Sequence, residues 1–207
     1  DCKDKEWGDF AAKMYSEGHS FFTYMSDNAD SLSSCCRLRN EIQDNGFSYT
    51  LGAGGVSTGS KSVLTINLNR CIQFAVNNNL DYKEYLTHII ELCHEVQLAY
   101  NENLKELLRN HMLPLFDAGY INIDRQYLTI GINGLVEAAE FMGLDITPNE
   151  EYKKFVQTVL GLIETQNKAF RTKEAMFNCE MIPAENVGVK HAKWDSEDGY
   201  FVPRNCY

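Results

Sequence analysis

Two adjacent cysteines, Cys35 and Cys36, offer the clearest chemistry in this sequence. A disulfide between neighbours would close a strained ring, and adjacent side chains cannot both face one tetrahedral metal ion without distortion. The pair therefore indicates thiol chemistry rather than a crosslink or a metal site. Residue types alone leave three roles open for Cys36: a buried structural thiol, a thiolate nucleophile, or a redox or radical group.

The arginines that follow, Arg37 and Arg39, bear on the role of Cys36. Guanidinium groups near the sulfur would lower the pKa of the thiol and favour a nucleophile. A group that abstracts a hydrogen atom must instead begin as a protonated thiol, which a water-poor interior favours by raising that pKa. Cys35 has the weaker claim to catalysis, because packing on the opposite side of the same segment is the simpler role.

A glycine-rich stretch, residues 51–60, follows the cysteines and precedes an apolar run over residues 63–68. Glycine permits positive φ and close backbone approach, so a cysteine-tipped segment beside such a stretch can enter a crowded interior. We interpret residues 32–62 as a finger loop. The glycines do not match a P-loop, because their spacing differs from GxxxxGK[ST] and the next segment has the composition of a strand.

Polar residues also stand where predicted strands pass into predicted helices. Asn67 and Asn133 end two strands, and a Pro-Ala-Glu-Asn corner follows a third. In α/β proteins, ligands bind at the carboxyl ends of strands, and a helix N-terminus offers free amides to a phosphate. We therefore predict substrate contacts at Asn67, Asn133, Glu185 and Asn186, and at Ser34 beside the cysteines. Simple capping of the helices is the alternative at the corners.

Strands and helices alternate along the chain. The predicted strands are residues 63–68, 127–132 and 176–182, and the predicted helices are residues 4–17, 69–78, 82–112 and 135–142. Parallel strands need crossover connections of this length, so the pattern predicts a helix-rich α/β fold with parallel pairing. Three strands are too few to close a barrel.

Three segments carry more detailed predictions. Residues 82–112 place Val96 and Tyr100 on one apolar stripe with their neighbours, which predicts a long amphipathic helix. Thr147, followed by Pro and then Glu at suitable positions, is the expected N-cap of a further helix. From Val187 onward we expect mostly loop.

The composition excludes several classes of protein. With 207 residues, 44% hydrophobic and 23% charged, the chain has the composition of a globular domain. Its net charge of −10 argues against a nucleic-acid partner, because such binding depends on neutralising phosphates with Lys and Arg. No apolar run approaches the roughly 18 residues of a membrane span. Seven cysteines without a CxxC pair indicate a reducing compartment, hence the cytoplasm, and no metal site is predicted.

Five motifs together give the sequence a specific resemblance. They are CCRLRNE from Cys35, GAGGVSTGSKS from Gly52, LTINLNR from Leu64, LTIGINGLVEAAE from Leu128 and MIPAENVGVKHAKW from Met181. In these segments the chain resembles the anaerobic, glycyl-radical ribonucleoside-triphosphate reductases. The resemblance extends over most of residues 20–207. It implies that the α/β unit belongs to a ten-stranded α/β barrel, with the finger loop inside it.

The resemblance also implies a role for the paired cysteines. In this family, the cysteine at the tip of the finger loop becomes a transient thiyl radical that removes the 3′ hydrogen of the ribose, so that the 2′ hydroxyl can leave. The matching residue is Cys36, directly before Arg37. The substrates so implied are ribonucleoside triphosphates, and the reductant is formate or a dithiol system.

Further cofactors and partners follow from the same resemblance. An intact family member uses a glycyl radical installed by a radical-SAM activase with an iron-sulfur cluster, a C-terminal zinc site, and ATP or deoxynucleotide effectors, and it is expected to be a homodimer. The Gly-Tyr pairs at Gly119 and Gly199 lack the Arg-Val-x-Gly-Tyr context of the radical site. We therefore expect residues 1–207 to be one partial catalytic-barrel domain, without the N-terminal allosteric and C-terminal glycyl-radical regions and inactive in isolation.

Two alternatives stand beside this interpretation. The first is another glycyl-radical enzyme of the pyruvate formate-lyase type, which also has a ten-stranded barrel and finger-loop cysteines. The second is a non-catalytic helical interaction module that uses the stripe of residues 82–112. Residues 51–70 and 128–140 favour the reductase.

Overall fold

The parallel pairing predicted from the sequence is confirmed. The computed structural model describes residues 4–19, 31–33, 39–41, 59–119, 121–182 and 185–207. Within these ranges, β3 (Gly59–Asn67), β4 (Gln126–Asn133) and β5 (Met176–Met181) form a three-stranded parallel sheet with β4 at the centre. β4 is buried along nearly its whole length, as expected of a central parallel strand covered on both sides.

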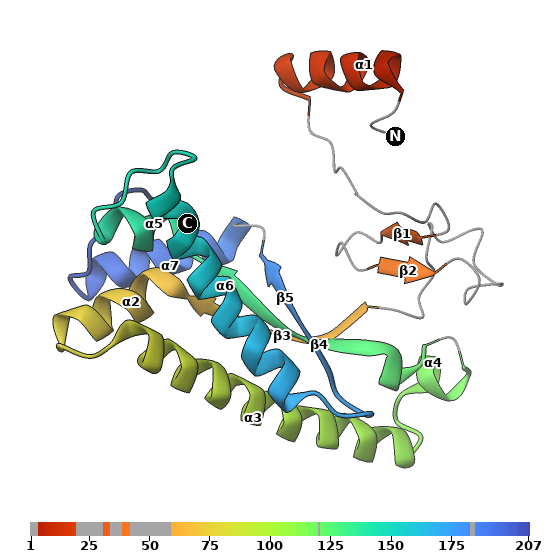
Figure 1. The fold of residues 1–207 in the computed structure, drawn as a ribbon. Coiled ribbons are helices and arrows are strands. Elements are labelled where there is room, and N and C mark those ends of the chain that lie inside the picture. Colours follow the sequence, from red (N-terminus) through yellow and green to blue (C-terminus); the bar gives the residue numbers. More distant parts are fainter. Residues whose placement is uncertain (1–3, 20–30, 34–38, 42–58, 120, 183–184) are drawn as a thin grey trace.

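Four helices carry most of the hydrophobic core against one face of this sheet. They are α2 (Leu68–Asn77), α3 (Tyr82–Arg109), α5 (Leu135–Phe141) and α6 (Glu150–Phe170). α3 and α6 lie side by side across the strands (Figure 1). Fully buried aliphatic side chains from both layers meet there, among them Ile72, Leu86, Ile90, Ile130, Val159 and Ile163. The helix-rich α/β class is therefore confirmed, as a small parallel sheet with helices packed on it.

The buried stripe of α3 differs from the predicted one. Leu86 and Ile90 are fully buried as expected, but Val96 and Tyr100 are 59% and 43% exposed. The buried positions farther along the helix are polar: His94, Gln97 and Asn101. They are buried because they find partners. Gln97 Nε2, for example, donates a hydrogen bond of 2.7 Å to the carbonyl oxygen of Thr129 in β4. A search for apolar periodicity alone places the stripe on a neighbouring face of the helix.

The start of α6 lies two residues beyond the predicted cap. Asn149, not Thr147, is the N-cap, and its Oδ1 accepts a hydrogen bond of 2.8 Å from the backbone N–H of Tyr152. Asn149 Nδ2 in turn donates to Thr147 Oγ1 at 2.9 Å. Both residue types are suitable caps. The helix begins at Glu150, so the residue at the cap position is Asn149.

The prediction of loop after Val187 is wrong, because α7 runs from Glu185 to Glu197. The helix is hard to recognise in the sequence, since its buried positions include the small Ala192 and the charged Asp195 rather than a row of large apolar side chains. Burial of Asp195 is possible because polar groups of other elements surround it. His191, expected in a loop, lies on this helix.

The remaining described elements are short. α1 (Lys5–Ser16) confirms the predicted first helix, and its N-cap, Asp4, accepts a hydrogen bond from the backbone N–H of Trp7. β1 (Ser31–Ser33) and β2 (Arg39–Glu41) pair antiparallel and were not predicted. α4 (Pro114–Asp117) and the 3₁₀ turn η2 (Ile123–Arg125) lead into β4. None of the helices in the described ranges has the length and apolar character needed to cross a lipid bilayer.

Candidate functional site at the carboxyl ends of the strands

The carboxyl ends of the three parallel strands bring two predicted site residues together. Asn67 and Asn133 are register partners at the ends of β3 and β4. Asn133 Nδ2 donates a hydrogen bond of 3.3 Å to the carbonyl oxygen of Ile182, which directly follows β5. Asn133 is only 6% exposed, and its Oδ1 has no hydrogen-bond partner among the described residues. A buried amide oxygen without a donor is a candidate for contact with a ligand.

Asn67 has its polar atoms engaged within the protein. Its Oδ1 caps α2 by accepting a hydrogen bond of 3.1 Å from the backbone N–H of Arg70. Its Nδ2 lies 2.9 and 3.0 Å from the two carboxylate oxygens of Asp195. The capping role that the sequence left open is therefore present, and Asn67 also ties the end of β3 to α7.

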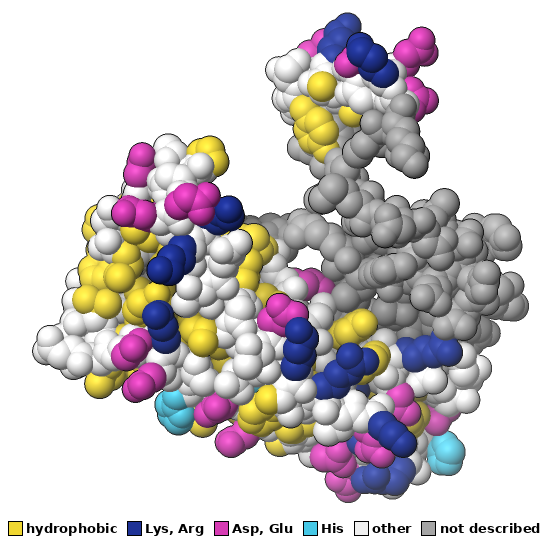
Figure 2. Space-filling view, in the orientation of Figure 1, with side chains coloured by type: hydrophobic (Ala, Val, Ile, Leu, Met, Phe, Trp, Pro, Cys, Tyr) yellow, Lys and Arg dark blue, Asp and Glu magenta, His cyan; other side chains and the backbone are white. Residues whose placement is uncertain are grey.

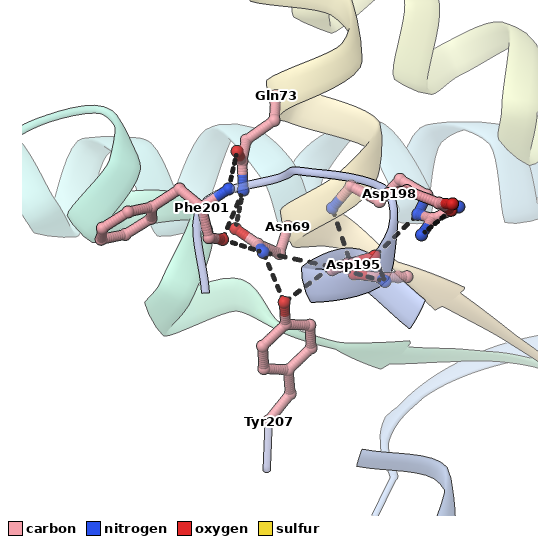
Figure 3. Close-up of polar contacts among 8 residues, drawn as sticks. Asn69, Gln73, Asp195, Asp198, Phe201 and Tyr207 are labelled. Carbon is pink, nitrogen blue, oxygen red and sulfur yellow. Dashed lines mark hydrogen bonds and ion pairs between the residues drawn. The ribbon is translucent and has the colours of Figure 1, made fainter. Parts of the chain in front are cut away.

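Asp195 is the centre of this polar cluster and is fully buried (Figure 3). Besides Asn67, its carboxylate accepts hydrogen bonds from Arg70 Nε at 2.7 Å, from the Tyr207 hydroxyl at 2.6 Å and from Asn69 Nδ2 at 3.2 Å. A buried carboxylate is tolerated only when it is paired and hydrogen-bonded, and here one cation and several neutral donors satisfy it. The cluster fixes the start of α2 relative to α7.

A second set of hydrogen bonds fastens the segment after α7 to α2. Gln73 Nε2 donates to the carbonyl oxygen of Phe201 at 2.9 Å, and the backbone N–H of Phe201 donates to Gln73 Oε1 at 2.8 Å (Figure 3). Gln73 Nε2 also reaches Asn69 Oδ1 at 2.7 Å, which aligns the asparagine for its contact with Asp195. The side-chain amide of Gln73 therefore holds the backbone of Phe201 against α2.

The same segment is also held to α5. Arg204 forms hydrogen bonds of 2.6 Å with Glu137 Oε1 and with Glu140 Oε1. Gly134, the N-cap of α5, adopts a φ of +75°, and a Cβ there would lie 3.1 Å from the backbone nitrogen of Asn69. Glycine thus permits both the left-handed turn and the close approach of α5 to α2.

Charge and burial shift the protonation of the cluster. Burial alone would lower the pKa of the Arg70 guanidinium, but its contacts with Asp195 and Asp198 outweigh that effect and raise it. Burial, followed by the hydrogen bond to Asp195, raises the pKa of the Tyr207 hydroxyl far above its ordinary value. At neutral pH, Arg70 is therefore charged and Tyr207 is a neutral donor, as the carboxylate of Asp195 requires.

Three of the four thiols in the described part of the chain differ from a reactive cysteine. Burial raises the pKa of Cys71 to about 12 and that of Cys179 to about 11, and it raises the pKa of Cys93 as well. All three are therefore protonated and inert as nucleophiles at neutral pH. They serve the core rather than chemistry.

The other predicted site residues lie partly or wholly outside the described ranges. Ser34, Cys35 and Cys36 fall in residues 34–38, which are not described. Most of the proposed finger loop also lies outside the described ranges. Glu185 begins α7 and Asn186 is exposed in its first turn, whereas the side chain of Glu185 is not described.

No described group of three or more His, Cys, Asp and Glu side chains is arranged to hold a metal ion. Over α3 and α6, acidic and basic side chains are intermixed on the face that Figure 2 shows. Several form exposed pairs one helical turn apart, such as Lys168 with Glu164 at 2.6 Å. Such pairs contribute little to stability. The strand ends, not this face, gather convergent polar groups.

Sequence reasoning missed the central residue of the cluster. Asp195 was overlooked because the segment around it was expected to be loop, and Asn69 and Tyr207 because neither residue type at its position indicates a particular chemistry. One signal was available: Asn67, Asn69, Arg70 and Gln73 put four polar side chains at the cap and in the first turns of a short helix that follows a buried strand. So many polar groups at a buried helix start require a charged or polar partner.

The comparisons with known proteins agree on one family. The family model for the anaerobic ribonucleoside-triphosphate reductases matches residues 3–207. The chain therefore belongs to this family. No curated protein matches the sequence.

Solved structures of anaerobic ribonucleotide reductases are similar to this chain in fold and sequence. The enzyme from Thermotoga maritima in complex with dATP and CTP is 32% identical over 89% of this chain, with a TM-score of 0.72. The same enzyme with dATP in its specificity site is 31% identical over 81% of this chain, with a TM-score of 0.68. The chain covers 31% and 28% of those two proteins, respectively, so it spans less than a third of their length.

Proposed function

We propose that the protein containing this chain reduces ribonucleoside triphosphates to deoxyribonucleoside triphosphates, with Cys36 as the residue that carries the thiyl radical. The observation that carries the proposal is the family match over residues 3–207, which includes Cys36. The described thiols at Cys71, Cys93 and Cys179 lie in the core and do not compete for this role. The family model and both solved structures are reductases, so the pyruvate formate-lyase alternative and the interaction module are not favoured.

The proposed reaction conserves atoms and electrons. The sulfur radical of Cys36 takes the 3′ hydrogen atom of the ribose, so that an S–H bond forms while the C3′–H bond breaks. The 2′ hydroxyl then leaves as water after it is protonated. Formate with a proton, or a dithiol, supplies two electrons and two hydrogens: one hydrogen ends in the water and the other forms the new C2′–H bond, while formate leaves as carbon dioxide or the dithiol as a disulfide. Cys36 then returns its hydrogen atom to C3′, which restores the sulfur radical. Cys35 has the lesser role of shaping the same segment.

The unpaired electron must come from elsewhere in the intact protein. Both Gly-Tyr pairs of the sequence lack the family's radical-site pattern, and the described residues offer no zinc site. We propose that the intact enzyme obtains a glycyl radical from a radical-SAM activase, responds to ATP or deoxynucleotide effectors, and acts as a cytoplasmic homodimer. Residues 1–207 are then one partial barrel domain, which we expect to be inactive in isolation.

We place the substrate at the carboxyl ends of β3, β4 and β5. In parallel sheets, ligands bind at this edge, and the free amides at the start of α7, around Glu185 and Asn186, suit a triphosphate. Asn133 offers its unpartnered Oδ1 there, and Ser34 completes the proposed set. Asn67 contributes indirectly, since its own atoms hold α2 and Asp195 in place.

The test is an activity assay of the full-length, activated enzyme with Cys36→Ser. We expect no deoxynucleotide product, because serine does not form the radical and all later steps depend on it. Cys93→Ser is the matched control, since this half-buried thiol of α3 has no proposed part in the reaction and its variant should remain active. Deoxynucleotide formation by the Cys36→Ser enzyme would refute the proposal.

A further inference from the structure

A row of polar side chains crosses all three strands of the parallel sheet. Ser60 Oγ of β3 lies 2.7 Å from Thr129 Oγ1 of β4, and Thr129 Oγ1 donates a hydrogen bond of 2.7 Å to Asn178 Oδ1 of β5. Asn178 Nδ2 then donates to Glu180 Oε1 at 2.9 Å. Each member thus orients the next, and the row ends on a carboxylate.

This row lies on the face of the sheet opposite the main core. Along β5, Phe177 and Cys179 pack into the hydrophobic clusters beneath the helices, so the alternating Asn178 and Glu180 point to the other face. Val63, the register partner of Thr129 on that other face, is 44% exposed. The row therefore belongs to a side of the sheet that is open at β3, although Thr129 in β4 is fully buried.

Glu180 has an unusual environment for a half-buried carboxylate. Within the described part of the chain, it forms no ion pair, and its hydrogen-bonding partner is the neutral amide of Asn178. Its register partner in β4 is Gly131, where a Cβ would lie 2.7 Å from Thr65 Oγ1 and 2.6 Å from Ile182 Cγ1. A charged side chain held in a fixed orientation without a cation is more typical of a ligand contact than of a structural contact.

A second acceptor lies on the same face, one step farther toward the carboxyl edge. Asn133 is two residues beyond Gly131 in β4, so its side chain points the same way as the row, and its buried Oδ1 has no partner in the described ranges. Glu180 and Asn133 are thus diagonal neighbours on adjacent strands. Asn133 Oδ1 has no donor in the described ranges, and the Glu180 carboxylate has only the one neutral donor, so this pair suits a ligand that supplies hydroxyl or amino hydrogens.

We infer that Glu180 and Asn133 form the acceptor pair that binds the sugar hydroxyls of the ribonucleotide, with Asn178, Thr129 and Ser60 as positioning residues. The inference rests on the proposed function, since it names how that substrate is held. Glu180 distinguishes a sugar with a hydroxyl from one without it, because loss of the donor leaves the carboxylate desolvated and unpaired.

The experiment compares Glu180→Gln with the unchanged full-length, activated enzyme. KM for CTP should rise about tenfold to a hundredfold, as expected for loss of a hydrogen bond to a charged group. The inhibition constants of CTP analogues lacking the 2′ or the 3′ hydroxyl, measured against CTP at saturating effector, supply the second readout. In the unchanged enzyme, each analogue should bind more weakly than CTP. In the variant, this difference in affinity should disappear for one of the two analogues, which damage to the fold alone would not produce.

Matched controls separate the possible failures. Glu164→Gln on the exposed face of α6 should leave KM and both inhibition constants unchanged. Thermal unfolding checks that the Glu180→Gln variant folds. If this variant does not fold, the experiment uses Glu180→Asp, which retracts the carboxylate. If Cys36→Ser abolishes turnover while the Glu180 variant keeps the original KM and analogue discrimination, this inference is overturned and the proposed function stands. An active Cys36→Ser enzyme refutes the function itself.

Discussion

The hydroxyl of Tyr207 donates a hydrogen bond of 2.6 Å to Oδ2 of the buried Asp195. The same hydroxyl oxygen lies 2.7 Å from Asn69 Nδ2, so Tyr207 stands between the carboxylate and α2. This contact closes the polar cluster at the carboxyl end of β3.

Tyr207→Phe tests this contact directly. Asp195 would lose one donor without gaining access to water, so we expect the free energy of unfolding to fall by about 1–3 kcal/mol. Tyr100→Phe on α3, where the side chain is 43% exposed, is the control and should change stability by less than about 0.5 kcal/mol. Chemical denaturation followed by circular dichroism gives both values. Equal stability of the two variants would show that the cluster does not depend on Tyr207.

Gly131→Ala should destabilise the sheet. The added Cβ would lie 2.6 Å from Ile182 Cγ1 and 2.7 Å from Thr65 Oγ1, which forces both side chains to move. We expect a loss of about 1–3 kcal/mol, typical of overpacking. Gly161→Ala in α6 is the matched control, because the added Cβ would have nothing within 4 Å beyond its chain neighbours and its own helix backbone, and alanine favours a helix by up to about 1 kcal/mol. A neutral or stabilising Gly131→Ala would contradict the close packing at the centre of β4.

His94 predicts a pH dependence of stability. Its ring is fully buried, with Nδ1 2.8 Å from the carbonyl oxygen of Ile90 and Nε2 2.8 Å from the side-chain amide of Asn167, and burial lowers its pKa. The unfolded chain therefore binds the proton more readily than the folded one. The contribution is fully present above the unfolded pKa of about 6.5 and is lost as the pH falls below it.

The measurement is the free energy of unfolding at several pH values between about 5 and 8, the interval in which histidine titrates. His94→Gln should reduce the slope below pH 6.5, apart from the part that His191 contributes, since burial lowers its pKa as well. His111→Gln is the control, because that side chain is 84% exposed. If His94→Gln and His111→Gln keep the same slope as the unchanged protein, burial of His94 does not affect its protonation.

The buried thiols should be slow to react. Because burial raises the pKa values of Cys71, Cys93 and Cys179, little thiolate forms at neutral pH, and the core also blocks access. We expect iodoacetamide to alkylate them at least about tenfold more slowly in the native protein than in denaturant, where thiols have ordinary pKa values. Peptide mass spectrometry at timed intervals gives the rate for each residue. Rapid alkylation of Cys71 in the native protein would show that α2 opens readily.

The alternation of strand and helix could be predicted from the sequence, because apolar runs such as that of β4 and the stripes of α3 and α6 have the periods of their elements. The burial of polar side chains could not be predicted. His94, Gln97 and Asp195 are inside because each meets a partner from a distant segment, and no local pattern reveals that partner. Of the predicted site, Asn67 and Asn133 do meet at one edge, whereas Glu180 is recognisable only once β5 is placed beside β4. The assignment of Cys36 rests on the family, since its surroundings lie outside the described residues.

The hydrogen bonds around Asp195 have a consequence for the order of folding. Those that reach the end of β3 and the start of α2 join positions 125 to 138 residues apart, as between Arg70 and Asp195 or between Asn69 and Tyr207. On a ribosome that adds amino acids from the N-terminal end, α2 and α3 are made long before their polar partners emerge. Closing so long a loop is slow compared with forming a helix. The polar side chains at the start of α2 therefore remain hydrated until translation has passed Tyr207. Only then can they exchange water for their partners in the cluster around Asp195.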